Sequence, residues 1–221
     1  MKTLNQYIKE KLIINKDYVD AHTLTPKSFD ELREIIEDRY EKLGPGTKQN
    51  PIDFNDIDVS NIDSFYNYNK SIYCDSGLFE RTKFKYIDIS DWDVSNVKTM
   101  RNMFQWCKEL KSVGDISKWD VSNVKTMRNM FQWCKELKSV GDISKWDVSK
   151  VIYMNGMFSN CYYFNQNISG WDVSSVTEMQ YMFYNCKKFN QDLSKWNVYY
   201  NVKNISMFDG CPIKNEYKPK F

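Results

Sequence analysis

Apolar residues recur along the chain in a fixed pattern that is copied in tandem. Residues 119–145 repeat residues 92–118 letter for letter, so the chain is a repeat array. Within the unit, Val97, Met100, Phe104 and Cys107 stand at i, i+3, i+7 and i+10, which is the spacing of one helix face. We therefore expect a short helix over residues 95–107 of each unit, capped by Ser95 or Asn96.

The rest of each unit predicts extended chain. Phe189–Ser194 alternates partly between apolar and polar positions, which is typical of a strand with one buried face. A unit of about 25 residues is too small to bury its own apolar face, so the units have to stack. The predicted fold class is an α/β repeat solenoid, in which a parallel β ladder with short helices is covered by an N-terminal helical cap. The core ladder is expected to contain Trp92, Trp119, Trp146, Trp171, Trp196, Phe104, Phe131, Phe158, Phe183, Phe208, Cys107, Cys134, Cys161, Cys186 and Cys211.

Two segments before the array predict helices. Leu4–Leu12 has the spacing of a short amphipathic helix, and Ser28–Glu31 is a capping box that opens a second helix ending at Gly44. We interpret the second helix as a cap over the end of the core. The expected organisation is a helical segment and cap over 1–51, a solenoid of about six units over 52–211, and a tail over 212–221. The first unit carries an insertion at 66–77.

Charge and composition exclude several classes of function. The 31 basic and 29 acidic residues leave a net charge of +2, so we expect neither a nucleic acid nor a membrane as partner. His22 is the only histidine, which removes most catalytic triads and imidazole metal sites. The N-terminal residues contain no apolar signal core, which predicts a cytoplasmic protein.

The cysteines and aspartates recur with the repeat, which favours structural roles. Five cysteines follow one another at steps of 27, 27, 25 and 25 residues, and we interpret them as buried thiols rather than as disulfides or metal ligands. The aspartate after each tryptophan, as in Asp93, is expected to accept backbone amides at a corner. A row of catalytic carboxylates is the alternative, but copied acids have no unique partner. We expect no metal, no cofactor and no enzymatic activity.

Candidate partner-binding residues stand where the repeat tolerates variation. Trp106 and Trp133 lie off the apolar stripe, and their counterparts are Asn160 and Asn185. Two tryptophans on a polar flank are typical of an interface hot spot; packing on each other and on the adjacent loop is the alternative. Further candidates are the repeated basic residues and the tyrosines at variable positions, namely Arg101, Arg128, Tyr153 and Tyr181.

The repeat resembles a known family. Residues 171–196, WDVSSVTEMQYMFYNCKKFNQDLSKW, are similar to the bacterial surface protein repeat of about 25 residues, which is related to BspA-like leucine-rich repeats. This resemblance implies a leucine-rich-repeat-like solenoid used for protein contacts. Short members without an export signal also look like phage-encoded ones, and residues 1–10 resemble the head-targeting peptides of some phage internal proteins.

These observations predict a non-enzymatic module that binds another protein. A phage origin would make it a host-interaction or virion-associated protein. Two alternatives stay open: a protein that binds or sequesters a small molecule or nucleotide, with Arg101 and Arg128 as contacts, and a structural virion component. The sequence leaves the identity of the partner, the binding face and the oligomeric state undetermined.

Overall fold

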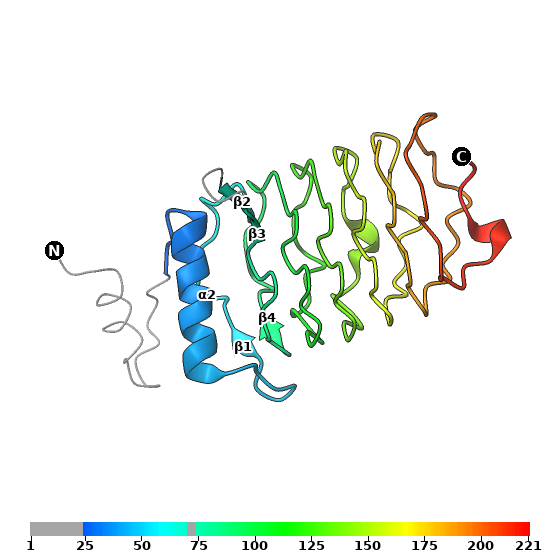
Figure 1. Ribbon diagram of the computed structural model, residues 1–221. Coiled ribbons are helices and arrows are strands. Elements are labelled where there is room, and N and C mark those ends of the chain that lie inside the picture. The colour runs from blue at the N-terminus through cyan, green and yellow to red at the C-terminus, as the bar shows by residue number, and fades with distance from the viewer. Residues whose placement is uncertain (1–23, 70–73) are drawn as a thin grey trace.

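The protein is a stack of similar turns arranged along one long axis. The computed structural model describes residues 24–69 and 74–221. Helix α2 (Phe29–Leu43) lies at one end of the stack and the C-terminal residues lie at the other (Figure 1). The helix expected over residues 4–12 and the head-targeting resemblance of residues 1–10 lie outside the described residues.

Helix α2 confirms the prediction made from the capping box. The Ser28 side chain accepts a hydrogen bond from the Glu31 amide at 3.2 Å, which satisfies one free N–H group of the first turn. At the other end, Gly44 adopts φ 74° and donates its N–H to the Tyr40 carbonyl at 2.8 Å. Leu32, Ile35 and Ile36 are buried, so the helix covers the apolar end of the stack.

Regular strands are short and belong to the N-terminal part of the stack. Strand β1 (Ile52–Asp53) pairs in parallel with β4 (Ile87–Asp88). Strands β2 (Tyr66–Asn69) and β3 (Cys74–Gly77) form an antiparallel hairpin, with Tyr66 opposite Gly77. This hairpin occupies the insertion expected at 66–77. Two 3₁₀ helices follow, η1 (Ile143–Lys145) and η2 (Asn215–Tyr217).

The ladder that joins successive turns runs through the segment predicted to be helical. Parallel bridges link Thr99 to Thr126, Thr126 to Tyr153, Tyr153 to Glu178 and Glu178 to Lys203. After each bridge, every second residue donates its N–H to the next turn, as Met100 does to the Thr126 carbonyl at 3.0 Å. The helix expected over 95–107 is therefore wrong, and the strand expected at Phe189–Ser194 is not formed either. Pairing between turns supplies the hydrogen bonds that a helix would make internally.

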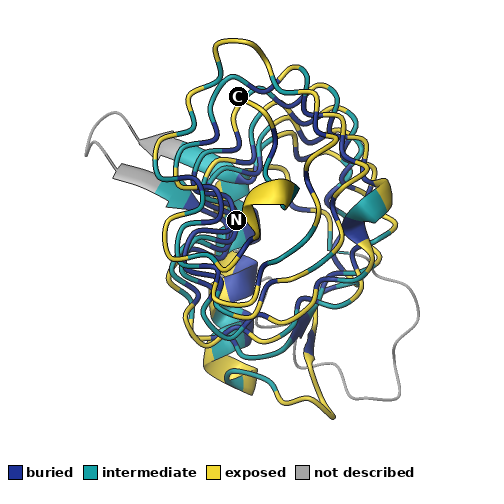
Figure 2. Cartoon of the chain, turned by 90° about the vertical axis from the view of Figure 1, so that its right-hand side faces the viewer, coloured by how far each residue is buried: buried dark blue, intermediate teal, exposed yellow. Residues whose placement is uncertain are grey.

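Apolar side chains fill the interior of the turns, and each stacks on the equivalent side chain of the neighbouring turn. The rings of Phe104, Phe131 and Phe158 follow one another at 5.2 and 5.8 Å, each pair within 4° of parallel. Trp119 stacks on Trp146 at 6.4 Å. The view along the stack shows exposed residues at the outer bends of the superposed turns (Figure 2). The expected core residues are buried except Phe208 and Cys211, which are partly buried because they belong to the last turn.

Candidate partner-binding surface

Trp106 and Trp133 occupy a strained backbone position of the ladder. Their N–H groups donate to the next turn, to the carbonyls of Gln132 and Ser159, both at 2.8 Å. Both residues adopt left-handed φ values, 65° and 66°, a conformation that costs a residue with a Cβ roughly 1–2 kcal/mol. The counterparts in later turns are Asn160, Asn185 and Gly210, also with positive φ, and these residue types tolerate it. The backbone therefore does not favour tryptophan here.

The two indoles stack on each other, and a lysine amine lies near each ring. The ring centroids lie 4.7 Å apart and the planes are 8° from parallel. The Lys108 Nζ lies 5.0 Å from the centroid of Trp106, and the Lys135 Nζ lies 4.9 Å from that of Trp133. Both tryptophans remain partly exposed. We call these four residues, Trp106, Trp133, Lys108 and Lys135, the tryptophan face.

A hollow of about 440 Å³ lies beside Trp106. Its lining is Arg81, Thr82, Lys83, Trp106, Lys108 and Glu109. Three of these side chains are cationic and one is acidic, and Glu109 is paired with Lys85 at 3.4 Å. A second hollow of about 500 Å³ shares Arg81, Thr82 and Lys83 and extends to α2. The tryptophan face is thus continuous with a depression that leads to the cap helix.

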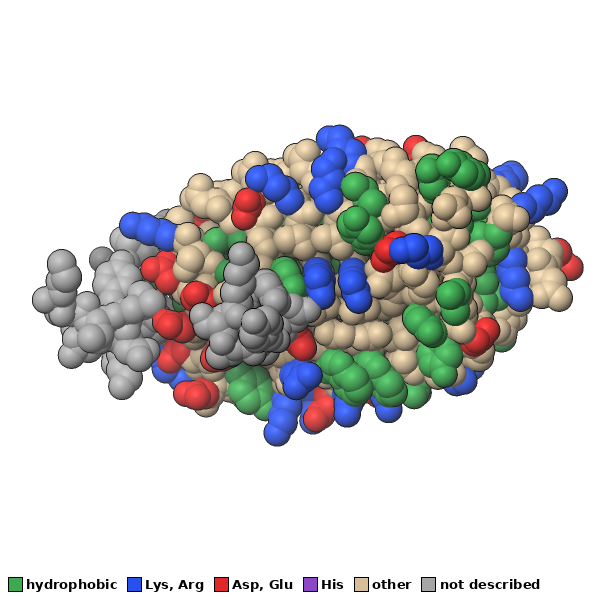
Figure 3. All heavy atoms as spheres, turned by 45° about the horizontal axis from the view of Figure 1, so that its top comes forward, with side chains coloured by type: hydrophobic (Ala, Val, Ile, Leu, Met, Phe, Trp, Pro, Cys, Tyr) green, Lys and Arg blue, Asp and Glu red, His purple; other side chains and the backbone are tan. Residues whose placement is uncertain are grey.

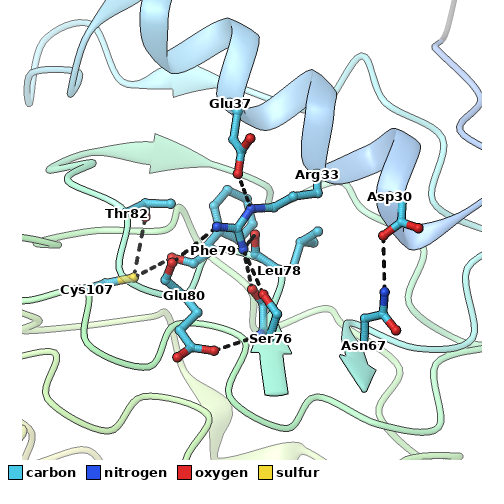
Figure 4. A network of polar contacts seen from close by, with 11 residues as sticks. Asp30, Arg33, Glu37, Asn67, Ser76, Leu78, Phe79, Glu80, Thr82 and Cys107 are labelled. Atoms are coloured by element: carbon cyan, nitrogen blue, oxygen red, sulfur yellow. Dashed lines mark hydrogen bonds and ion pairs between the residues drawn. The ribbon is translucent and has the colours of Figure 1, made fainter. Parts of the chain in front are cut away.

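Arg33 holds the cap helix against the first turn at the border of the second hollow. Its Nη1 donates to the carbonyls of Gly77 at 2.6 Å and Leu78 at 3.1 Å. Its Nε donates to Glu37, one helical turn further along α2, at 2.7 Å. Figure 4 shows the guanidinium pointing from α2 into this group of carbonyls, with the Glu80 side chain on the far side bonded to the Gly77 amide. This wall of the hollow is therefore rigid and polar.

The structure places the two predicted arginines on the ladder segment, and Arg101 contacts the hairpin. Arg101 lies near the hairpin, with its guanidinium carbon 4.7 Å from the centroid of Tyr66. Arg128 is exposed, and its N–H donates to the Thr126 hydroxyl at 3.3 Å. Both belong to the ladder segment, five residues before each tryptophan. They border the candidate surface without being part of the tryptophan face.

The two predicted tyrosines lie on the same ladder segment in later turns. Tyr153 is 42% exposed and Tyr181 is 47% exposed. Tyr153 stands in the bridge column between Thr126 and Glu178, whereas Tyr181 packs edge-on against Tyr184 at 5.9 Å. All six predicted residues thus belong to one stacked segment of the turns, residues 99–106 and their counterparts.

Sequence reasoning missed the lysines that lie over the indoles. Lys108 and Lys135 each follow a tryptophan by two residues in the tandem copies, and this repeated spacing was the available signal. Lys135 also lies 5.4 Å from the ring of Tyr162. Lysine amines over exposed aromatic faces contribute about 0.5–1 kcal/mol, so they help to orient the rings.

The repeated aspartates are corner residues. Asp93 accepts the Ser95 amide at 3.0 Å, and Asp147 accepts the Ser149 amide at the same distance, which confirms the expected role. Hydrogen bonds from the serine side chain, and then from its amide, lower the pKa of the Asp93 and Asp147 carboxyls. These carboxylates stay ionised and serve the turn geometry.

The cysteine column is a row of buried free thiols. The Cys134 Sγ lies 3.1 Å from the Phe104 carbonyl, and the Cys161 Sγ lies 2.9 Å from that of Phe131. Burial raises the pKa of the Cys161 and Cys186 thiols, because a thiolate is disfavoured away from water. Within 24–69 and 74–221, no cluster of three His, Cys, Asp or Glu residues has a geometry that could hold a metal ion.

Surface charge gives no single-signed field. In the face that Figure 3 presents, basic, acidic and hydrophobic side chains are intermixed over the stack. None of the helices in the described part of the chain is both long and apolar enough to cross a bilayer. The tryptophan face therefore stands out by its aromatic content rather than by its charge.

Comparison with known proteins gives one match. A family model described as "Mycoplasma protein of unknown function, DUF285" matches residues 53–141 and again residues 111–220. The two matches overlap and together span the array, as expected for a family that contains repeats. No curated protein and no solved structure matches the chain.

Proposed function

The chain belongs to the family described as Mycoplasma protein of unknown function, DUF285, and from this premise we propose that it is a non-enzymatic scaffold that binds another protein through the tryptophan face. The observation that carries this proposal is the left-handed backbone of Trp106 and Trp133. Strained positions occupied by an unfavourable residue are typical of functional sites. Asparagine, which other turns use at this position, would serve the fold at less cost.

The chemistry of the face supports a protein partner. Stacked indoles offer a large, rigid contact area, and tryptophan is enriched at the centre of interfaces. The partly exposed edges remain available although the two rings pack on each other at 4.7 Å. Lys108 and Lys135 add two amines at the rim, which suits a partner surface with apolar and acidic groups.

A binding role without chemistry is also supported by the duplication. Phe104 and Phe131, Cys107 and Cys134, and Trp106 and Trp133 are copies in adjacent turns, whereas a catalytic site is one unique constellation. We further propose that the chain is a leucine-rich-repeat-like solenoid related to BspA repeats, which is more specific than its family membership. What supports this likeness is the parallel ladder, whose bridges from Thr99 to Lys203 step by 25 or 27 residues.

The experiment compares the wild type with Trp106→Asn/Trp133→Asn in affinity capture from a bacterial lysate. Asparagine is the matched replacement because Asn160 and Asn185 occupy the same backbone position. A captured protein is then purified and its affinity measured by titration calorimetry. We expect the double variant to bind at least about 30-fold more weakly, the effect of losing a hot spot of about 2 kcal/mol.

Tyr200→Asn is the control, because Tyr200 is the most exposed aromatic residue described, at 89%. Loss of binding in this variant as well would indicate nonspecific adsorption to aromatic surface. Equal affinity of the wild type and the double asparagine variant would refute the role of the tryptophan face. Denaturant melts of both variants show whether each still folds.

A small anionic ligand is the second candidate function, favoured by the hollow beside Trp106. Arg81, Lys83 and Lys108 surround one indole there, which suits a planar group that carries a phosphate. Titration with adenosine monophosphate at low and high salt distinguishes the two functions. Salt-sensitive binding that is lost in Lys83→Gln would favour this alternative, and no heat of binding would exclude this nucleotide.

A further inference from the structure

Most hydrogen bonds of the ladder run in one direction: between Met100 and Asn185, each turn donates four N–H groups to the following turn, whereas a single N–H per turn runs back, as from Lys125 to the Lys98 carbonyl at 2.8 Å. In the last complete pair of turns, Met179, Tyr181, Phe183 and Asn185 donate to the carbonyls of Lys203, Ile205, Met207 and Asp209 at 2.7, 3.0, 2.9 and 2.8 Å. The residues between these acceptors, Asn204, Ser206, Phe208 and Gly210, hold the corresponding N–H groups of the last turn. We call these four N–H groups the C-terminal edge.

The C-terminal edge has no acceptor. Across 24–69 and 74–221, no hydrogen bond joins any of its four N–H groups to another residue. The residues after the array lie over the interior of the last turn, where Leu193 donates to the Tyr217 carbonyl at 2.8 Å and the Lys218 Nζ lies 5.9 Å from the ring centroid of Phe208, and none of them accepts from the edge. Ile205, in the middle of the edge, is 66% exposed. A row of donors at every second residue is the pattern by which a strand receives a neighbour.

The opposite end of the ladder is closed. There the first turn presents carbonyl groups to the N-terminal side, and Arg33 of α2 donates to those of Leu78 and Glu80 at 3.1 and 3.5 Å. A charged donor on a helix thus replaces the missing turn (Figure 4). The fold caps its acceptor end and leaves its donor end open.

We propose that the C-terminal edge binds a peptide segment of a partner protein, which follows the path of a further turn and adds one more rung to the ladder. The peptide supplies carbonyl groups at alternate residues to the N–H groups of Asn204, Ser206, Phe208 and Gly210. An apolar side chain of the peptide covers Ile205. This is strand addition, in which main-chain hydrogen bonds give affinity and side chains give selectivity.

A second copy of this chain does not fit as the occupant. Two copies that meet through these four N–H groups would bring donors against donors. A head-to-tail contact would need the carbonyls of Leu78 and Glu80, to which Arg33 already donates from α2. The row of four donors therefore favours a different chain that can present carbonyl groups at alternate residues.

The test uses a synthetic probe with the sequence of residues 99–107, TMRNMFQWC, with its cysteine replaced by serine. Throughout the array, the segments equivalent to residues 99–107 accept hydrogen bonds from the alternate N–H groups of the preceding turn. The probe therefore has the sequence of a segment that naturally follows such a row of donors. The labelled peptide is titrated against the full chain by fluorescence anisotropy. Amide exchange is followed by NMR, and we expect slower exchange at 204, 206, 208 and 210 when the peptide is bound.

Asn204→Pro and Asn204→Ala form a matched pair. Proline removes one N–H of the edge that has no acceptor within the chain, and Lys203 before it is in the extended ladder, which proline accepts. Alanine keeps the N–H and removes the side chain. We expect the proline variant to bind the peptide about three- to tenfold more weakly and the alanine variant to bind like the wild type.

Three outcomes would overturn the inference. They are absence of peptide binding to the wild type at millimolar concentration, protection of amides elsewhere than at the edge, and equal binding by the proline and alanine variants. A dimer that protects the edge in the absence of peptide, seen by analytical ultracentrifugation, would show a second copy as the occupant. The exchange measurement on the wild type decides the matter if the proline variant does not fold. Trp106→Asn/Trp133→Asn should keep peptide binding, so this site and the tryptophan face can fail separately.

Discussion

Replacing a stacked phenylalanine with alanine should lower the free energy of unfolding more in the middle of the stack than in its last turn. Phe131 is fully buried, with Phe104 at 5.2 Å on one side and Phe158 at 5.8 Å on the other. Phe208 holds the same position in the last turn, is partly buried and stacks on Phe183 alone, at 5.6 Å. Phe131→Ala leaves a closed cavity and should cost about 3–5 kcal/mol. Phe208→Ala removes a ring with one stacked neighbour and should cost about half as much.

Guanidinium denaturation, followed by circular dichroism and by tryptophan fluorescence, measures both free energies of unfolding. Stacked repeats can unfold in parts, so the values are compared only when the two probes coincide and the slope with denaturant is unchanged. A cost below about 1 kcal/mol for Phe131→Ala would refute the inward orientation of this column. An equal loss of unfolding free energy in Phe131→Ala and Phe208→Ala would refute the argument that the number of stacked neighbours sets the size of the loss.

Three further predictions concern the corners, the thiols and the cap. The folded-state pKa of Asp147 is lowered by the side-chain and amide hydrogen bonds of Ser149, so its contribution to stability is present above the unfolded pKa and is lost as the pH falls below about 4. Asp147→Asn keeps the hydrogen-bond acceptor, as Asn167 shows by accepting the Ser169 amide. Between pH 7 and pH 3, the stability of this variant should therefore fall less steeply than that of the wild type, and an unchanged slope would contradict this. In native protein treated with iodoacetamide, mass spectrometry should find Cys211 modified before Cys161, because Cys161 is fully buried and Cys211 only partly; the reverse order would contradict the packing. Arg33→Met removes the charged donor of the Gly77 and Leu78 carbonyls and should cost about 1.5–3 kcal/mol, with faster hydrogen exchange in α2; unchanged exchange there would show that the guanidinium does not hold the cap.

Several local features followed from residue types whose behaviour depends on near neighbours. Ser28 with Glu31 predicted the start of α2, and Gly44 predicted its end. Asp93 and its copies predicted corner hydrogen bonds to a residue two positions on. Each of these interactions closes within a few residues, so the sequence contains all of the participating atoms.

The ladder itself could not be assigned from local spacing. Val97, Met100, Phe104 and Cys107 fit a helix face, but the same residues also point inward from a turn that bends at Asn102 and Trp106 with φ values of 57° and 65°. Hydrogen bonds between turns, to residues 24 to 27 positions away, decide between the two. A spacing rule that considers one turn alone contains no information about those partners.

The tryptophan face also combines features that the sequence determined with features that only the structure decided. The sequence determined that Trp106 and Trp133 stand off the apolar stripe and repeat in tandem. Only the tertiary structure decided that their rings stack, that lysines lie over them and that their backbone is left-handed.

The sequence by itself determined the units of this protein: the copied turn, its apolar positions, its corners and its cap helix. The tertiary structure decided which segment of each turn pairs, and therefore which end of the ladder presents donors and which presents acceptors. The physical reason is that one turn can neither bury its apolar side nor satisfy its backbone groups alone. The neighbouring turns do both, and among the residues that the structure describes, none accepts from the N–H groups of Asn204, Ser206, Phe208 and Gly210 in the last turn.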